Sequence, residues 1–187
     1  GGTVEAGLRQ GSAVSVHACE LSPARVRAYN AAHGTNYTAR NIADNASLRA
    51  LKASQAEHYH ASPVCKNFSA ANNIRTASPN DLAIARSVAR DIREANPPTV
   101  SIENVPAYQD TALFKLIAKE LDDGGYNWDI VIVNAADHGA AQSRNRMIVR
   151  AVRKDVGELP PIPETTGSAD WYPLLKNLID AEEKVPL

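Results

Sequence analysis

A cysteine in a polar loop is the group in this sequence best placed to act as a nucleophile. Cys65 lies in ASPVCKNFS, residues 61–69, after a predicted helix and a short predicted strand. A cysteine retained for packing normally lies inside an apolar element, whereas one in a Ser/Pro/Asn loop is accessible for thiolate chemistry. The alternative, an ordinary loop cysteine without a chemical role, is not excluded by these neighbours alone.

Two later segments supply a carboxylate and a pair of guanidinium groups. Glu103 ends an apolar run within SIENV, residues 101–105, and Arg144 and Arg146 lie within QSRNR, residues 142–146. A carboxyl group at the end of a buried strand can be tuned by desolvation for proton transfer, and the planar guanidinium of arginine presents several fixed donors. Alternatively, Glu103 caps the turn that follows it, and the arginines lie on the surface of a polar loop.

Length and composition indicate one globular domain and exclude several functional classes. The chain has 187 residues, of which 44% are hydrophobic and 22% charged, and its formal net charge is −1. This charge gives no bulk attraction to nucleic acid, so such binding must come from local basic positions or from another segment. Two cysteines do not form a disulfide framework and fit a reducing compartment, and neither a signal peptide nor a membrane span is predicted.

Periodicity and capping residues predict alternating helices and strands. Ser22 is expected to cap the first long helix, with Pro23 in its first turn, and Asn80 or Asp81 to cap the third. We expect helices over 22–34, 46–57, 80–96 and 111–121, shorter helices over 4–8 and 174–179, and strands over 13–19, 59–61, 99–102, 129–133 and 147–152. The run at 129–133 is continuously apolar, which is typical of a strand buried on both faces.

The alternation predicts an α/β fold, with a doubly wound, mostly parallel, Rossmann-like sheet and helices on both faces. Ligands of such sheets bind beyond the carboxyl ends of the strands. Glu20, Cys65 and Glu103 each end or follow a predicted strand. We therefore expect these three side chains at one edge of the sheet.

Taken together and in this order, the motifs resemble those of the cytosine-C5 DNA methyltransferase family. The resemblance runs from Gly1 to about Val152. SPVCKNFS is similar to the family's Pro-Cys-Gln loop, ENV to its Glu-Asn-Val motif and QSRNR to its Gln-x-Arg-x-Arg motif. The resemblance implies a methyltransferase that flips cytosine out of the duplex, adds a cysteine thiolate to carbon 6 and transfers a methyl group from S-adenosylmethionine to carbon 5.

The resemblance assigns roles on the base side of the site. Cys65 would be the nucleophile, and Glu103 would protonate the ring nitrogen N3. Arg146 would contact the base oxygen O2, and Arg144 would help to hold the loop that carries Cys65. Asn104 is expected to hold the backbone near that loop. The implied substrate-binding residues are Ser69, Asn104 and Gln142, of which Ser69 is alternatively a turn residue and Gln142 a structural one.

The resemblance also implies a site for S-adenosylmethionine, and no metal. Glu20 is expected to accept hydrogen bonds from the ribose hydroxyls, and Leu21 to cover one face of the adenine. The acceptor for the adenine amino group is either Asn41 or Asp44. Asn41 belongs to an Asn-Ile pair that is similar to the family's Asp-Ile, whereas Asp44 is slightly favoured because its side chain is acidic. The residues expected to bind the cofactor are Gly2, Glu20, Leu21, Asn41, Asp44 and Pro63.

The sequence departs from the family's pattern at both ends and in the nucleophile loop. The family's opening strand and Asp-x-Phe-x-Gly-x-Gly turn have no counterpart here, nor has its target-recognition region. Val64 stands where the family has proline, and Lys66, which replaces glutamine, is expected to lower the pKa of Cys65. We expect a partial catalytic domain over 1–158, and a linker with the start of a target-recognition region over 159–187.

Three functional interpretations follow. The first is a DNA cytosine-C5 methyltransferase, as in restriction–modification, whose partners are double-stranded DNA with a flipped cytosine and a second chain or segment that supplies target recognition. The second is a catalytically impaired binding or regulatory subunit, or half of a split enzyme. The third is an RNA cytosine-C5 methyltransferase. Each is expected in the cytoplasm of a prokaryotic or phage-infected cell, or in the nucleus of a eukaryote, without a membrane partner.

Overall fold

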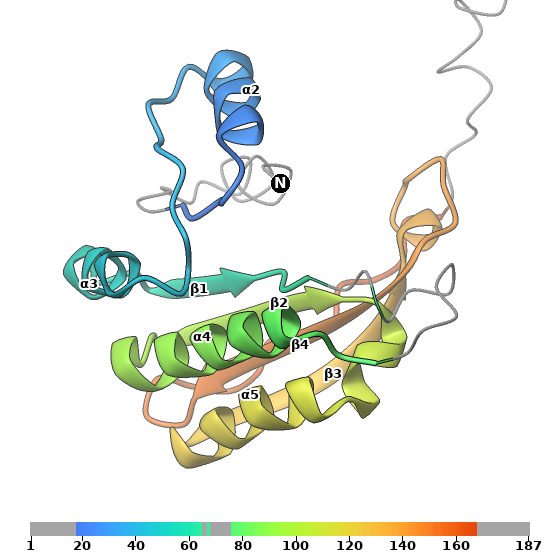
Figure 1. The fold of residues 1–187 in the computed structure, drawn as a ribbon. Coiled ribbons are helices and arrows are strands. Elements are labelled where there is room, and N and C mark those ends of the chain that lie inside the picture. The colour runs from blue at the N-terminus through green and yellow to red at the C-terminus, as the bar shows by residue number, and fades with distance from the viewer. Residues whose placement is uncertain (1–17, 65–66, 68–75, 168–187) are drawn as a thin grey trace, which may run out of the picture.

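The computed structural model describes residues 18–64, 67 and 76–167 of the chain (Figure 1). The helices predicted at 4–8 and 174–179, and most of the strand predicted at 13–19, lie outside these residues. Ala18 and Cys19, the described end of that strand, have no strand conformation. No helix in the described part of the chain has the length and apolar character that crossing a membrane requires.

Helices and strands alternate as predicted, with ends that differ by a few residues. In chain order the elements are α2 Pro23–His33, α3 Asn45–Ser54, β1 His58–Ala61, α4 Pro79–Ala95, β2 Thr99–Asn104, the 3-10 helix η1 Pro106–Asp110, α5 Ala112–Asp123, β3 Tyr126–Asn134, the 3-10 helix η2 Ala135–Asp137 and β4 Asn145–Arg153. Ser22 caps α2 as predicted, since its side chain accepts a hydrogen bond from the amide of Arg25.

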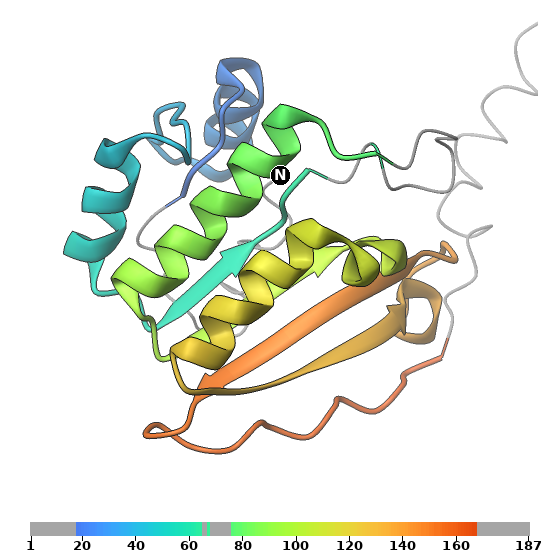
Figure 2. The same cartoon turned by 60° about the horizontal axis from the view of Figure 1, so that its bottom comes forward.

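The four described strands form one sheet in the order β1-β2-β4-β3. β1 pairs with β2 in parallel, whereas β4 is antiparallel to both β2 and β3. β1, β2 and β3 therefore run in the same direction, and only β4 is reversed. Figures 1 and 2 show α4 and α5 side by side along one face of this sheet. The predicted α/β class is confirmed.

The expectation that the strand at 129–133 is buried on both faces is wrong. β4 inserts between β2 and β3, which leaves β3 at the edge of the described sheet. Most residues of β3 are consequently only partly buried, and Ile132 is 47% exposed. A continuous apolar run is typical of a central strand but does not establish where in the sheet the strand lies.

The N-terminus of α4 also differs from its prediction. Ser78, rather than Asn80 or Asp81, is the cap, and its side chain accepts a hydrogen bond from the amide of Asp81. The carboxylate of Asp81 in turn accepts one from the amide of Ser78, which completes a reciprocal capping box. Asn96 ends the helix in the left-handed conformation, with φ of 43°.

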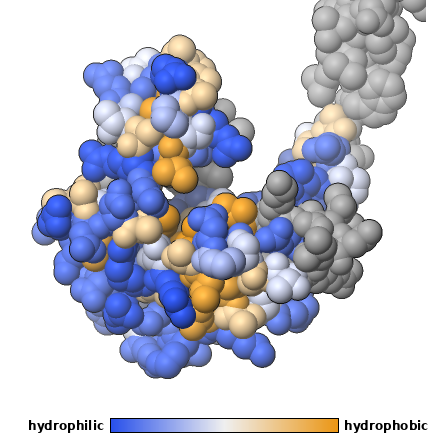
Figure 3. All heavy atoms as spheres, in the orientation of Figure 1, coloured by the Kyte–Doolittle hydropathy of each residue, from blue (hydrophilic) through white to orange (hydrophobic). Residues whose placement is uncertain are grey.

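The core lies between the sheet and the pair α4 and α5. Alternate residues of β2 and β4 point toward the helices, and Val100, Ile102, Met147 and Val149 are at most 1% exposed. The residues between them, which include Ser101, Glu103 and Arg146, lie on the opposite face, which is therefore more polar. In the view of Figure 3, hydrophilic residues cover most of the outer surface and apolar residues gather near the middle.

Candidate active site

Two parallel strands bring the segment that leads to Cys65 and the residues Glu103 and Asn104 to one edge of the sheet. β1 and β2 are in register from His58 opposite Thr99 to Ala61 opposite Ile102. The segment that leads to Cys65 therefore leaves β1 beside the carboxyl end of β2, where Glu103 and Asn104 lie. These two segments meet at the carboxyl edge of the parallel pair. Cys65 itself lies outside the described residues, and Glu20, which was expected at the same edge, does not follow a described strand.

Asn104 joins the two strand ends. Its side chain is 1% exposed, and its Nδ2 atom donates a hydrogen bond to the carbonyl oxygen of Pro63 across 3.0 Å. The Oδ1 atom of the same side chain accepts from the amide of Val105 at 2.9 Å. The amide group of Asn104 thus both donates and accepts a hydrogen bond, and it fixes the backbone at Pro63 and Val105. Loss of either bond would leave a buried polar group without a partner.

A second hydrogen bond links Asn67, two residues after Cys65, to the start of α4. Asn67 Nδ2 donates to Asp81 Oδ2 across 2.6 Å, and the same oxygen accepts from the amide of Ser78 at 2.8 Å. Desolvation raises the pKa of Asp81, but the hydrogen bonds from Ser78 and Asn67 outweigh it, so that the pKa lies below its ordinary value. The α4 capping box, which was not predicted from the sequence, thus also holds the side chain of Asn67.

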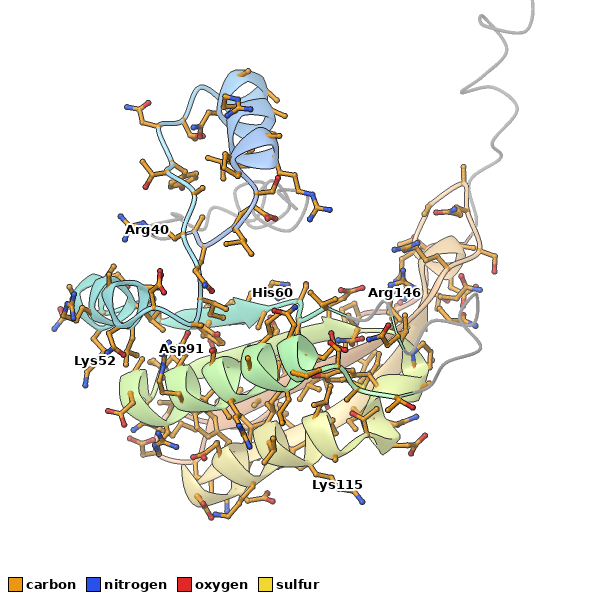
Figure 4. All side chains as sticks on the ribbon, viewed as in Figure 1. Arg40, Lys52, His60, Asp91, Lys115 and Arg146 are labelled. Carbon is orange, nitrogen blue, oxygen red and sulfur yellow. The ribbon has the colours of Figure 1, made fainter. Side chains whose placement is uncertain are left out.

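Glu103 and Arg146 form an ion pair on the face of the sheet opposite α4 and α5. The distance between Glu103 Oε1 and Arg146 Nε is 2.7 Å, and the two side chains are 30% and 19% exposed. Arg146 Nη1 donates to the carbonyl oxygen of Asn145, while Nη2 makes no hydrogen bond within the described residues. Arg146, labelled in Figure 4, therefore keeps a donor at the edge where β2 ends.

Arg144 and Gln142 lie in the turn before β4 and are both exposed. The backbone of Arg144 is fixed to the end of β3, because its amide donates to Asn134 Oδ1 at 2.9 Å and its carbonyl oxygen accepts from Ala135 at 3.0 Å. Neither side chain makes a hydrogen bond to a described residue. Ser69, expected in the nucleophile loop, lies outside the described residues.

A hydrogen-bonded chain that the sequence did not reveal starts at the beginning of β1 and β2. Thr99 Oγ1 donates to the carbonyl oxygen of Glu57 at 2.9 Å, so the contact of 2.8 Å between Thr99 Oγ1 and His58 Nδ1 requires the proton on Nδ1. His58 Nε2, which is then without a proton, accepts from Ser101 Oγ at 2.8 Å. In the sequence, the two histidines occupy alternate positions of β1 and the two hydroxyl residues Thr99 and Ser101 occupy alternate positions of β2, but nothing local shows that the two sets meet.

The chain continues toward the carboxyl edge. Because the Ser101 hydroxyl donates its hydrogen bond to His58, the Ser101 oxygen accepts one from His60 Nδ1 at 2.8 Å. His60 Nε2 then accepts from Ser62 Oγ at 3.1 Å. Desolvation lowers the pKa of both histidines, which favours the neutral rings that this arrangement uses. The chain ends at Ser62, beside the Pro63 carbonyl that Asn104 holds.

The residues expected to bind the adenosine half of a cofactor form a second group. Glu20 Oε1 accepts from the amide of Ser22 at 2.9 Å, and the Glu20 carbonyl oxygen accepts from the amide of Arg40 at 2.9 Å. The segments at 20–22 and 40–44 are thereby held together. Leu21 is 66% exposed, so an apolar side chain stands in solvent next to a carboxylate. Figure 4 places Arg40 well away from Arg146. Gly2 lies outside the described residues.

Asn41 and Asp44 differ in how far their side-chain oxygens are already used. Asn41 Oδ1 accepts from the amide of Ala43 at 3.0 Å. Asp44 stands at the N-cap position of α3, yet its side chain makes no capping hydrogen bond, and it is exposed. Its carboxylate is therefore the more available acceptor of the two. In the described part of the chain, no group of three metal-ligating side chains occurs.

Comparison with known proteins finds one family whose profile matches nearly the whole chain. The sequence profile of the family described as C-5 cytosine-specific DNA methylase matches residues 1–183. The type II methyltransferase M.FnuDI of Fusobacterium nucleatum is 31% identical over 97 residues, which are 50% of this chain and 28% of that protein. M1.BsuMI of Bacillus subtilis (strain 168) is 33% identical over 107 residues, 56% of this chain and 25% of its own length. The matched segments thus cover about a quarter of these relatives.

Solved structures share the fold. The Dnmt2 methyltransferase of S. pombe superposes with a TM-score of 0.68 at 22% identity, over 83% of this chain and 48% of its own. The Entamoeba histolytica methyltransferase EhMeth gives a TM-score of 0.66 at 19% identity, over 81% and 48%. At these identities the likeness supports the fold alone, and the family match carries the assignment.

Proposed function

The chain belongs to the C-5 cytosine-specific DNA methylase family, and from that premise we propose that it carries the catalytic centre of an S-adenosylmethionine-dependent enzyme that methylates carbon 5 of cytosine in DNA. The observation that carries the proposal is the meeting of three groups at one edge of the sheet. The three groups are the Pro63 carbonyl, which Asn104 holds, the Glu103 carboxylate, and the Arg146 guanidinium that pairs with it.

The proposed reaction begins with a thiolate. Carbon 5 of cytosine is a poor nucleophile, and addition of the Cys65 thiolate to carbon 6 turns the ring into an enamine that is nucleophilic at carbon 5. The cytosine must leave the stack for this attack, because carbon 6 is not accessible within a duplex. After methylation, loss of the carbon 5 proton and elimination of the thiolate restore the ring and free Cys65.

Glu103 and Arg146 act on the opposite edge of the base in this proposal. In its protonated form the Glu103 carboxyl group gives a proton to the ring nitrogen N3, which makes carbon 6 more electrophilic. The carboxylate left behind pairs with Arg146, and it takes the proton back when the thiolate is eliminated and the ring is restored. The Nη2 atom of Arg146 donates to the base oxygen O2, while Nε holds the carboxylate in place. Asn104 is a positioning residue, because its amide holds the segment that leads to Cys65 and does not face the base.

The described residues fit the adenosine half of S-adenosylmethionine, which supplies the methyl group when bound. Glu20 would receive the ribose hydroxyls, the exposed Leu21 would lie against the adenine ring, and Asp44 would accept from the adenine amino group. Asp44 is preferred to Asn41 because the Asn41 oxygen already accepts from Ala43. Pro63 lies at the sheet edge beside the base-side residues.

Covalent trapping tests the proposal. Fluorine at carbon 5 of cytosine cannot leave as the proton does, so an adduct with duplexes that contain 5-fluorocytosine persists through denaturation when S-adenosylmethionine is present. We expect this adduct with the unaltered protein and with Cys19→Ala, and none with Cys65→Ala. A 5-fluorocytosine RNA of the same sequence, run in parallel, distinguishes the nucleic-acid substrate. Persistence of the adduct in Cys65→Ala, or its absence in the unaltered protein, would contradict the assignment.

A further inference from the structure

Side chains hold four consecutive carbonyl oxygens in the segment that precedes α3. Every carbonyl from residue 40 to residue 43 accepts a hydrogen bond from a side chain of another segment. The donors are Cys19 Sγ to Arg40 at 3.3 Å, Ser47 Oγ to Asn41 at 2.7 Å, Arg90 Nη2 to Ile42 at 2.7 Å and Arg90 Nη1 to Ala43 at 3.1 Å. A loop with this many side-chain contacts to its backbone is fixed in one conformation.

Arg90 contributes two of these bonds from α4, and it is itself fixed. Its Nε and Nη2 atoms donate to Asp91 Oδ1 at 3.1 and 2.7 Å. The hydroxyl of Tyr59 on β1 donates to Asp91 Oδ2 at 3.4 Å, and Asp91 and Tyr59 are 4% and 8% exposed. Because the guanidinium is planar, its orientation on Asp91 decides where Nη1 and Nη2 point. The sheet, α4 and the 40–44 segment are thus joined through one arginine, near the position labelled Asp91 in Figure 4.

Asp44 is the next residue after the last carbonyl that Arg90 holds. Its own side chain does not cap α3 and is exposed, although aspartate at this position usually caps. Its backbone is further fixed because its amide donates to the carbonyl oxygen of Asn41 at 3.1 Å. The result is a carboxylate free to accept a hydrogen bond on a backbone held in place by α4.

We propose that Arg90 is a positioning residue for adenine recognition: by holding the carbonyls of Ile42 and Ala43, it places the Asp44 carboxylate to accept from the adenine amino group. The inference rests on the proposed function, because it takes the 40–44 segment as part of the cofactor site. It goes beyond that function because it attributes the preference for an adenine ring in the cofactor to a residue of α4 that does not touch the cofactor.

The test compares two ligands whose purine rings differ at position 6 and its neighbour N1. S-Adenosylhomocysteine carries the amino group, and S-inosylhomocysteine carries an oxygen in its place together with a hydrogen on N1. Titrations followed by protein-detected NMR measure dissociation constants into the millimolar range. We expect the unaltered chain to prefer the adenosyl ligand about tenfold, the size of one hydrogen bond. Arg90→Met should weaken adenosyl binding by about the same factor and leave inosyl binding unchanged, so that the preference disappears.

Further variants separate positioning from loss of structure. Arg90→Lys keeps the charge beside Asp91 but cannot reach both carbonyls with a planar fork, so an intermediate preference is expected. Arg86→Met, one turn earlier on α4 and exposed, is the control and should bind both ligands as the unaltered chain does. Asp44→Asn should lose the preference on its own, and adding Arg90→Met to it should cause no further loss, because both act through one contact.

Each other outcome contradicts the inference in a distinct way. An unchanged preference in Arg90→Met, with Asp44→Asn impaired, would show that Arg90 does not position the carboxylate. Equal weakening of both ligands in Arg90→Met and Arg90→Lys would show a general structural role. Failure of the unaltered chain to bind either ligand would overturn the cofactor assignment and this inference with it, whereas the first two outcomes leave the proposed function in place.

Discussion

The buried amide of Asn104 donates a hydrogen bond to the carbonyl oxygen of Pro63 across 3.0 Å, so the strand that carries Glu103 also holds the segment that leads to Cys65. This hydrogen bond gives a physical reason for the order Glu103, Asn104, Val105 at the end of β2. The carboxylate is presented at the edge, and the next side chain turns inward, because successive residues of a strand point to opposite faces.

Removal of the Asn104 amide is expected to impair both stability and trapping. Asn104→Ala leaves the Pro63 carbonyl and the Val105 amide without their partner in a buried region, which should lower the free energy of unfolding by about 1–3 kcal/mol. Asn104→Asp can still accept from Val105 but cannot donate to Pro63, so it should also slow adduct formation with 5-fluorocytosine DNA. Urea unfolding and trapping rates measure the two effects. Asn80→Ala, exposed in the first turn of α4, should change neither.

The Asp81 carboxylate should stabilise the protein at neutral pH and lose that effect in acid. Its pKa in the folded state lies below the ordinary value of 3.8, so its contribution is present above that value and disappears as the pH falls through the folded pKa. Asp81→Ala should lower the free energy of unfolding by about 1 kcal/mol near neutral pH, the usual effect of a lost helix cap. Denaturant unfolding at a series of pH values measures the difference, which should vanish in strong acid. A constant difference across the series would contradict the assignment, and the exposed Asp110→Ala is the control.

The elements and the edge at which they converge could be predicted from local sequence, whereas the order of the strands could not. Ser22 before Pro23 marks the start of α2, and the apolar run at 99–102 before Glu103 marks β2, because capping and periodicity are local properties. The reversal of β4 and its insertion between β2 and β3 depend on contacts between residues far apart in the chain. The apolar run of β3 therefore suggested a central strand, whereas β3 lies at the edge of the sheet that the described strands form.

Site residues could be predicted where they belong to a short sequence motif. They could not be predicted where the site depends on contacts between residues that lie far apart in the sequence. Asn104 was expected to hold the nucleophile loop because it lies within a motif. Arg90 contacts Ile42 from 48 positions away, and His58 contacts Ser101 from 43 positions away, and neither pair belongs to a recognisable pattern. The Ser-x-x-Asp spacing of Ser78 and Asp81 is the sequence pattern of a capping box. The prediction instead chose Asn80 or Asp81 as the cap, because they lie closer to the first apolar residue of the helix.

The ion pair of Glu103 with Arg146 is expected to matter for chemistry more than for stability. Glu103→Gln removes the acid that we propose to act at N3, and trapping should slow by about 10²–10⁴-fold, the usual contribution of a general acid. The control is Asp129→Asn, which breaks the ion pair of Asp129 with Arg150 between β3 and β4 on the same face of the sheet. That variant should trap at the rate of the unaltered protein. Equal slowing in both would indicate that any ion pair on this face is required for folding.

The histidines of β1 are expected to be neutral with the proton on Nδ1, and to destabilise the fold when they gain a second proton. The ¹⁵N chemical shifts of His58 and His60 report the tautomer directly, and Nε2–H tautomers would contradict the chain of donors that starts at the Thr99 hydroxyl.

Since desolvation lowers the pKa of both rings below 6.5, the unfolded chain binds more protons below that value, and stability should fall as the pH drops through it. The free energy of unfolding, measured between about pH 7.5 and 5.5, should fall less in a His58→Asn/His60→Asn variant, because the unfolded state then no longer gains these protons. The exposed His138→Asn is the control and should keep the pH dependence of the unaltered protein.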